Sequence, residues 1–205
     1  MAKETKLERE KATIVGLRHH ARRLSIKEGI FSTIRQSVGD SYIVPFAIAI
    51  NASNFLIGMI TSISGLFGPI SQWFSSRLIE KYPRKKIVVT SLLYECLIWI
   101  PLIIIAFLFY KGILTSLLPL SLLLFFSIYA IISNIAGPAW FSWIGDIVDE
   151  NYRGKWFSKR NLRLGIVAVI FTLLAAFFLD FFKAKGMIML GFIILFVLAM
   201  TARLI

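Results

Sequence analysis

The chain has 205 residues, of which 58% are hydrophobic and only 17% are charged, and its mean hydropathy is +0.78. That composition leaves too little polar surface to cover a soluble protein of this length and indicates a membrane protein. The formal charge of +12 falls in a few blocks between apolar runs, which is typical of the cytoplasmic side of a bilayer protein and argues against a nucleic-acid partner.

The charged segment 1–27 is interpreted as a retained cytoplasmic tail, and residues 28–205 as one transmembrane domain. The segment has no apolar stretch followed by a small-residue cleavage site, so it does not resemble a signal peptide. His19 and His20 are adjacent and point in different directions on a helix, which favours a solvated basic tail over a metal site. A helix lying at the lipid headgroups is expected here. The apolar residues that can share one of its sides are Ile14, Val15, Leu17 and Leu24.

Six apolar runs are long enough to cross a bilayer core of about 30 Å, which takes about 20 helical residues. The runs are continuous rather than alternating with polar residues, which favours helices over the strands of a barrel. The sequence therefore predicts an all-α membrane protein with six transmembrane helices. The predicted spans are about 29–50, 55–79, 87–110, 114–148, 164–182 and 187–205.

The connections between the predicted spans alternate in their content of Lys and Arg. The tail carries eight, the connection around 81–86 carries five with Arg77 included, and the connection 149–163 carries five. The other three connections carry none, one and two. Because basic residues concentrate on the cytoplasmic side, the N-terminus is predicted to be cytoplasmic, and an even number of spans returns the C-terminus there.

A similar arrangement occurs at both basic connections: a Gly-Pro pair, then an acid and an arginine twelve and sixteen residues after the glycine. Because Pro83 is expected to end its helix, Glu80 lies at a helix C-terminus, where the backbone dipole disfavours an anion and a cationic partner is expected. The alternative is a solvated loop that only sets topology. The candidate partners are Arg77, Arg84, Lys85 and Lys86. The two copies are Gly68-Pro69 with Glu80 and Arg84, and Gly137-Pro138 with Asp149 and Arg153.

The stretch SRLIEKYPRKK resembles the signature loop between the second and third helices of the major facilitator superfamily, with Ser76 and Pro83 in place of its two glycines and Glu80 in place of its Asp. The segment 138–161 resembles the loop after the fourth helix. Together with the six spans, the resemblance implies the N-terminal half of a twelve-helix transporter. It further implies a charge lock at the cytoplasmic helix ends, pairing in one conformation and separating in another. The residues that it assigns to this lock are Glu80, Arg84, Lys85, Asp149 and Arg153.

The function implied by the resemblance is secondary active transport of a small solute across the cell membrane by alternating access. Its expected partners are the substrate, a coupling proton or ion, the lipid bilayer and a second six-helix half, either on the same longer chain or on another chain. The fourth predicted span has no Arg, and the fifth has neither a second glycine nor a proline. These departures from the proton-coupled exporters of the family leave the direction of transport open.

Ionisable residues inside predicted spans are costly and mark candidate functional sites. Arg35 and Asp40 lie in the first span and Glu95 in the third. Asp40 is expected to share a polar stripe facing a central cavity with Thr33, Gln36 and Ser37, because these precede it at helical spacing. Arg35 is expected to snorkel or to pair with another helix. The candidate substrate or ion path is Asp40, Gln36, Arg35 and Glu95; structural hydrogen bonds between helices are the competing interpretation for the two acids.

Other classes of function have little support in the sequence. The chain lacks the His-Glu-x-x-His, phosphate-loop and Gly-x-Ser-x-Gly motifs of common enzymes, so no enzymatic activity is expected. Cys96 is the single cysteine, which excludes a disulfide framework and a thiolate metal site, and no metal or cofactor is expected. A membrane scaffold without transport activity is the alternative function.

Overall fold

The computed structural model describes the backbone of residues 2–204 and the side chains of residues 16–63 and 65–204. Every regular element within the described backbone is helical. The long helices are α1 (Ala2–Val38), α3 (Asn54–Lys81), α4 (Arg84–Tyr110), α5 (Leu118–Ile147), α6 (Glu150–Ala184) and α7 (Ile188–Leu204). A short 3-10 turn, η1 (Asp40–Tyr42), and a two-turn helix, α2 (Ile43–Ala49), lie between α1 and α3.

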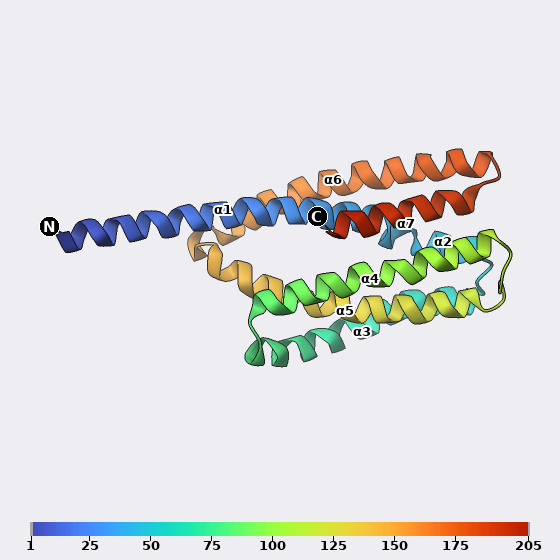
Figure 1. The fold of residues 1–205 in the computed structure, drawn as a ribbon, viewed down its shortest axis with the longest axis horizontal. Helices are drawn as coiled ribbons and strands as arrows, with labels where there is room; N and C mark the ends of the chain where they lie inside the picture. The colour runs from blue at the N-terminus through green and yellow to red at the C-terminus, as the bar shows by residue number, and fades with distance from the viewer. Residues whose placement is uncertain (1, 205) are drawn as a thin grey trace.

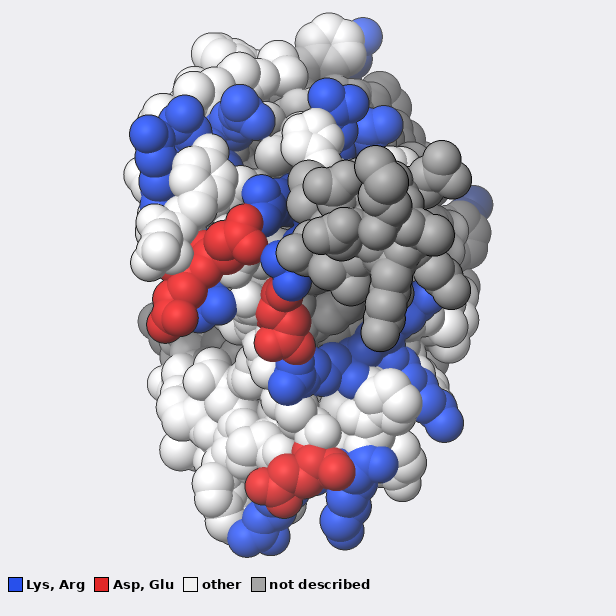
Figure 2. All heavy atoms as spheres, turned by 90° about the vertical axis from the view of Figure 1, so that its left-hand side faces the viewer, with Lys and Arg blue, Asp and Glu red and all other residues white. Residues whose placement is uncertain are grey.

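The helices form two layers, as Figure 1 shows. One layer consists of α1, α6 and α7, the other of α3, α4 and α5, and the main contact between the layers is α4 against α7. Three segments lie together at one end of the bundle, namely the N-terminal part of α1, the turn 82–83 and the α5–α6 junction at 148–149. We call this the basic end. Figure 2 looks onto it and shows Lys and Arg side chains spread across the surface with acidic side chains between them.

The main apolar core lies along the contact between the two layers. Trp99 of α4 and Phe196 of α7 are completely buried, with ring centroids 5.5 Å apart. Phe46 of α2 meets Phe196 edge to face at 5.0 Å. Buried aromatic pairs of this kind add about 0.5–1.5 kcal/mol beyond their area burial. The two layers are therefore held together mainly by α2, α4 and α7.

Local sequence explains where the helices begin and end. The Ser53 hydroxyl accepts a hydrogen bond from the Leu56 N–H at 3.3 Å and caps α3. Pro83, with a non-helical ψ of 131°, precedes α4, and Asp149 is the N-cap residue of α6. Leu114 has a φ of 52°, a left-handed conformation that a helix interior does not allow, so α5 begins at Leu118 rather than at the predicted residue 114.

The first predicted span, 29–50, is interrupted at Gly39. A Cβ atom on Gly39 would lie 2.4 Å from Trp99 Cη2 and 2.7 Å from Ala199 Cβ, so a side chain has no room there. The chain continues as the 3-10 turn η1 and the helix α2. At the other end of the span, α1 runs without a break through the predicted boundary between tail and membrane domain at residue 28. Of the apolar tail residues, the side chains of Ile14 and Val15 lie outside the described part, while Leu17 and Leu24 are exposed.

Within the described residues, four helices are long and apolar enough to cross a membrane, namely α3, α4, α5 and α6, and α7 is a shorter apolar helix. The predictions 55–79 and 87–110 agree with α3 and α4 to within three residues at each end. The fifth prediction, 164–182, lies inside the much longer α6. The first and sixth spans stay predictions.

Candidate functional site

Asp40 occupies the 3-10 turn and faces two polar side chains. The Tyr129 hydroxyl of α5 donates a hydrogen bond to Asp40 Oδ1 at 2.7 Å. Arg35 Nη1 lies 3.2 Å from Asp40 Oδ2, and the Arg35 side chain is only 7% exposed. Because η1 turns the chain after Gly39, Asp40 points back toward Arg35, five residues earlier, instead of continuing the face of α1. A carboxylate held by a charged and a neutral donor is well stabilised inside an apolar bundle.

Glu95 of α4 is completely buried and is held from two other helices. Arg203 Nε, near the end of α7, lies 2.7 Å from Glu95 Oε2, and Arg35 Nη1 of α1 lies 3.8 Å from the same oxygen. Arg35 therefore bridges Asp40 and Glu95. The other oxygen of Glu95, Oε1, has no hydrogen-bond partner within the described side chains. These contacts tie the layer of α1 and α7 to α4.

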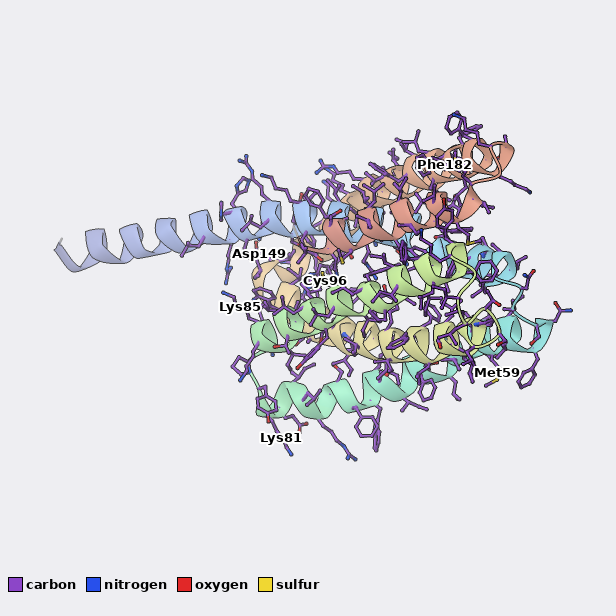
Figure 3. All side chains as sticks on the ribbon, turned by 45° about the vertical axis from the view of Figure 1, so that its right-hand side comes forward. Met59, Lys81, Lys85, Cys96, Asp149 and Phe182 are labelled. Carbon is purple, nitrogen blue, oxygen red and sulfur yellow. The ribbon has the colours of Figure 1, made fainter. Side chains whose placement is uncertain are left out.

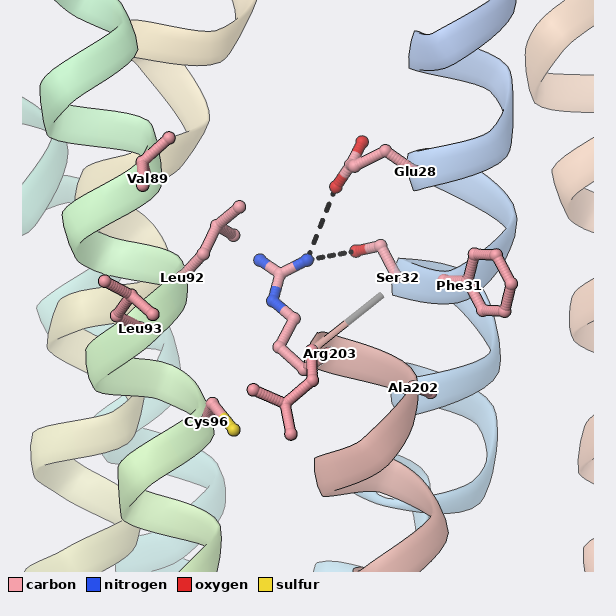
Figure 4. A pocket seen from close by; sticks show the side chains of 10 residues that line it. Glu28, Phe31, Ser32, Val89, Leu92, Leu93, Cys96, Ala202 and Arg203 are labelled. Atoms are coloured by element: carbon pink, nitrogen blue, oxygen red, sulfur yellow. Dashed lines mark hydrogen bonds and ion pairs between the residues drawn. The ribbon is translucent and has the colours of Figure 1, made fainter.

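Arg203 continues the network toward the basic end. Its Nη1 donates to the Ser32 hydroxyl at 3.1 Å and lies 3.4 Å from Glu28 Oε1, as Figure 4 shows. On the other side, Arg160 Nη2 of α6 lies 3.9 Å from Glu28 Oε2. Six ionisable side chains thus form one continuous network across four long helices and the turn η1. They are Glu28, Arg35, Asp40, Glu95, Arg160 and Arg203.

Two adjoining cavities open beside this network. One, of about 260 Å³, lies between α1, α4, α5, α6 and α7 and is lined by Arg35, Glu95 and Arg160 among others. The second, of about 210 Å³, is drawn in Figure 4 and contains Cys96. Glu28 and Arg203 line both cavities. Charged groups and solvent-sized space therefore lie together inside an otherwise apolar bundle.

Among the described side chains, the other residues of the predicted polar stripe form no hydrogen bond with the Asp40 carboxylate. Thr33 donates to the Gly29 carbonyl at 2.8 Å, and Ser37 donates to the Ala168 carbonyl of α6 at 3.3 Å. The Gln36 side chain is exposed. The structure thus groups Asp40 with Arg35 and Glu95, and it places Gln36 on the outside of α1.

At the basic end, the residues of the predicted charge lock meet partners that the sequence did not suggest. Arg84 pairs with Asp146 of α5 and lies 3.4 Å from the Ser142 carbonyl. Arg153 donates to the Gly145 carbonyl at 2.7 Å. Glu80 and Lys85 are exposed, and the described side chains include no ion-pair partner for either. The pairing of Glu80 with Arg84 therefore stays a prediction that this conformation does not display.

Asp149 is bound by the N-terminal helix. Arg22 Nη2 lies 2.8 Å from Asp149 Oδ2, Arg18 Nη1 lies 3.1 Å from Oδ1, and Arg22 also reaches the Ile147 carbonyl at 3.3 Å. The hydrogen bond from Arg22, followed by the positive charges of Arg22 and Arg18, holds the pKa of Asp149 below its ordinary value. Figure 3 shows Lys81, Lys85 and Asp149 at the basic end, with Met59 and Phe182 at the other.

Several network residues were missed by the sequence reasoning. Arg203 lies in the sixth predicted span and is signalled by the same rule that selected Arg35, an ionisable residue in an apolar run. Arg160 was counted with the basic connection 149–163, and Glu28 lies just before the first predicted span; nothing in their spacing suggests that Arg160 is buried. Tyr129 looks like any aromatic residue of an apolar span. Among the described side chains, no group of three or more His, Cys, Asp and Glu residues is placed to hold a metal ion.

Comparison with known families identifies the family to which the chain is similar. Residues 30–205 match the family model described as Major Facilitator Superfamily. The match covers all of the chain except the basic N-terminal segment. Comparison with curated proteins and with solved structures finds no match.

Proposed function

Because the chain belongs to the major facilitator superfamily, a family of membrane transporters, we propose that it forms the N-terminal six-helix half of a secondary active transporter of the cell membrane. In this proposal it moves a small solute by alternating access. The observation that carries the proposal is the buried ion network beside two cavities in an apolar bundle. Buried charges of this kind are expensive in a bilayer and mark transport pathways.

The proposed topology has six spans with both ends in the cytoplasm. The segment from Gly29 through η1 and α2 forms the first span, and α7 forms the sixth. The basic end faces the cytoplasm, because the tail 1–27, the turn 82–83 and the start of α6 bring most Lys and Arg there. The turns at the opposite end, around Asn51, Lys111 and Lys185, carry few charges.

The proposed substrate or ion path runs along Arg35, Asp40 and Glu95, whereas Gln36, also predicted from the sequence, is exposed on the outside of α1 in this conformation. Arg35 Nη1 faces both carboxylates, at 3.2 Å from Asp40 Oδ2 and 3.8 Å from Glu95 Oε2. Protonation of one carboxylate, or a substrate bound to Arg35, changes the charge balance at the other. That sharing provides a physical route for coupling a proton or ion to the solute.

A second six-helix half is expected to complete the cavity. The outer face of α6 supports this, because large apolar side chains are exposed along its length and must face lipid or another helical half. They include Leu162, Ile166, Val169, Ile170, Leu173, Leu174, Phe177 and Phe181. The second half belongs to the same longer chain, to another copy or to another subunit.

The proposed lock consists of Glu80, Arg84, Lys85, Asp149 and Arg153. In this conformation Arg84 and Asp149 hold other partners, Asp146 and Arg22, at the basic end. Exposed pairs of this type are weak because solvent screens them, so they can exchange partners during a conformational change. We propose that exchange of Arg84 between Asp146 and Glu80 accompanies opening and closing at the cytoplasmic side.

Proteoliposome uptake by the complete transporter tests the function. Sugars, amino acids, organic anions and cationic drugs are screened with and without an imposed proton or sodium gradient. D40N is expected to abolish gradient-driven accumulation while leaving the protein folded, and Q36A is expected to reduce it less. Absence of flux for every solute class, in protein shown to be folded, would overturn the transporter proposal in favour of a scaffold.

A further inference from the structure

Arg160 of α6 is the least compensated cation of the buried network. Arg203 lies 2.7 Å from a carboxylate oxygen of Glu95, and Arg35 lies 3.2 Å from one of Asp40. Arg160 comes no closer than 3.9 Å to its acid, Glu28, whose side chain is 38% exposed and also faces Arg203 at 3.4 Å. A half-exposed carboxylate at that distance offsets little of the cost of burying a guanidinium.

The position of Arg160 is fixed although its charge is poorly paired. Its guanidinium lies in a notch of α1, where a Cβ on Gly29 would come within 2.4 Å of Nη2. Its Cζ lies over the Trp140 ring, 4.5 Å from the centroid, and Nη2 donates to the Ser25 carbonyl at 3.5 Å. The residue is only 9% exposed, and its Nε has no partner within the described side chains. A guanidinium stacked on an aromatic ring keeps its edge free for a planar acceptor.

The cavity beside Arg160 has the lining expected of an organic-anion site. Three arginines and two glutamates line its 260 Å³, so the lining carries net positive charge. Glu95 is already held by Arg203, which leaves Arg160 as the group with most to gain from a ligand. The rest of the wall is apolar or aromatic, with two hydroxyls. These residues are Val88, Leu92, Ala136, Gly137, Trp140 and Phe141, with Ser32 and Ser133.

We infer that this cavity binds a small organic monocarboxylate, with the carboxylate on Arg160 and a compact apolar body against Trp140 and Phe141. A carboxylate is the ligand that an arginine edge binds through two parallel hydrogen bonds. The aromatic part of the wall favours a compact apolar body over a polyol, and the volume of about 260 Å³ suits a small ligand. This inference rests on the proposed transport function, for which it names the substrate class.

Binding of benzoate tests the inference without requiring transport. The full chain is placed in nanodiscs of neutral phosphatidylcholine, and radiolabelled benzoate is measured by equilibrium dialysis against unlabelled benzamide and benzylammonium. Wild-type protein is expected to bind benzoate at least about tenfold more tightly than either competitor, because only benzoate supplies a charged acceptor. R160Q is expected to lose at least about tenfold in benzoate affinity, and R160K somewhat less.

The matched control is R163Q, which removes an exposed arginine from the same helix and is expected to leave binding unchanged. R160K guards against misfolding, since it keeps the buried charge. Equal binding of benzoate and benzamide, or unaltered benzoate binding by folded R160Q, overturns the substrate class. If the complete transporter then carries another solute, the transport proposal stands. If benzoate binds through Arg160 but no solute class is transported, the transport proposal fails, while the inferred carboxylate-binding site is supported.

Discussion

Replacing Arg203 by glutamine is expected to destabilise the protein strongly, because it removes the closest partner of a completely buried carboxylate. Arg203 lies 2.7 Å from Glu95, which is 0% exposed. Breaking a buried ion pair costs about 3–5 kcal/mol. Arg35 stays 3.8 Å from Glu95 but also serves Asp40. We therefore expect the lower end, about 3 kcal/mol, or roughly two powers of ten in the folding equilibrium.

The assay is the fraction of protein that stays monodisperse in detergent after heating, compared across variants. The double variant E95Q/R203Q is expected to recover most of the loss, since it leaves two neutral groups in place of an unpaired charge. The control is E28Q, whose half-exposed carboxylate lies 3.4 Å from Arg203 and whose loss should cost less than about 1 kcal/mol. The reasoning fails if R203Q is as heat-resistant as the wild type, or if the double variant is less stable than R203Q.

Three further substitutions test separate parts of the structure. G39A is expected to lower the free energy of unfolding by about 1–3 kcal/mol, because the added methyl group clashes with buried Trp99. G58A, which has open space around it, should be neutral or slightly stabilising in the same heating assay. Equal effects of the two substitutions would contradict the close packing at Gly39. The pKa of Asp149 is lowered, so its contact with Arg22 should be complete above the ordinary value of 3.8 and lost only as pH falls through the lowered value. Side-chain carboxyl NMR should show that midpoint shift upward in R22Q; an unchanged midpoint would remove Arg22 as its cause. Y129F removes the hydrogen bond that the Tyr129 hydroxyl donates to Asp40, and its loss is expected to destabilise the Asp40 carboxylate by about 1–3 kcal/mol. Gradient-driven uptake is expected to fall; uptake equal to that of the wild type would show that transport does not depend on this hydrogen bond.

The length and position of the apolar runs predict α3 and α4 well, because their ends carry local signals. Ser53 caps one helix and Pro83 separates the two, and both signals act within a few residues. Hydropathy predicts only the apolar part of α6. Its first turns, from Glu150, are polar and helical because Asp149 begins the helix outside the proposed bilayer.

The break in the first span was not predictable from Gly39 alone, since glycines occur within several other helices of this chain. The reason for the break lies in Trp99 and Ala199, which are distant in sequence. The partners in ion pairs likewise depend on residues that are distant in sequence. The spacing in the sequence suggested Arg84 for Glu80, four residues away, whereas the structure pairs Arg84 with Asp146, 62 residues away. Candidate residues such as Asp40 and Glu95 can be selected by their cost in a membrane, but their partners depend on tertiary packing.

The separation of Glu95 from Arg203 by 108 residues has a consequence for biosynthesis. At about 5–20 residues per second, a ribosome needs roughly 5–20 s to make the intervening chain. During that interval α4 must enter the bilayer with its carboxylate facing only Arg35, which has already emerged. A nascent chain that ends before Ile188 is therefore expected to integrate α4 poorly, and E95Q should restore its integration. A helix made later thus decides whether an earlier one stays in the membrane.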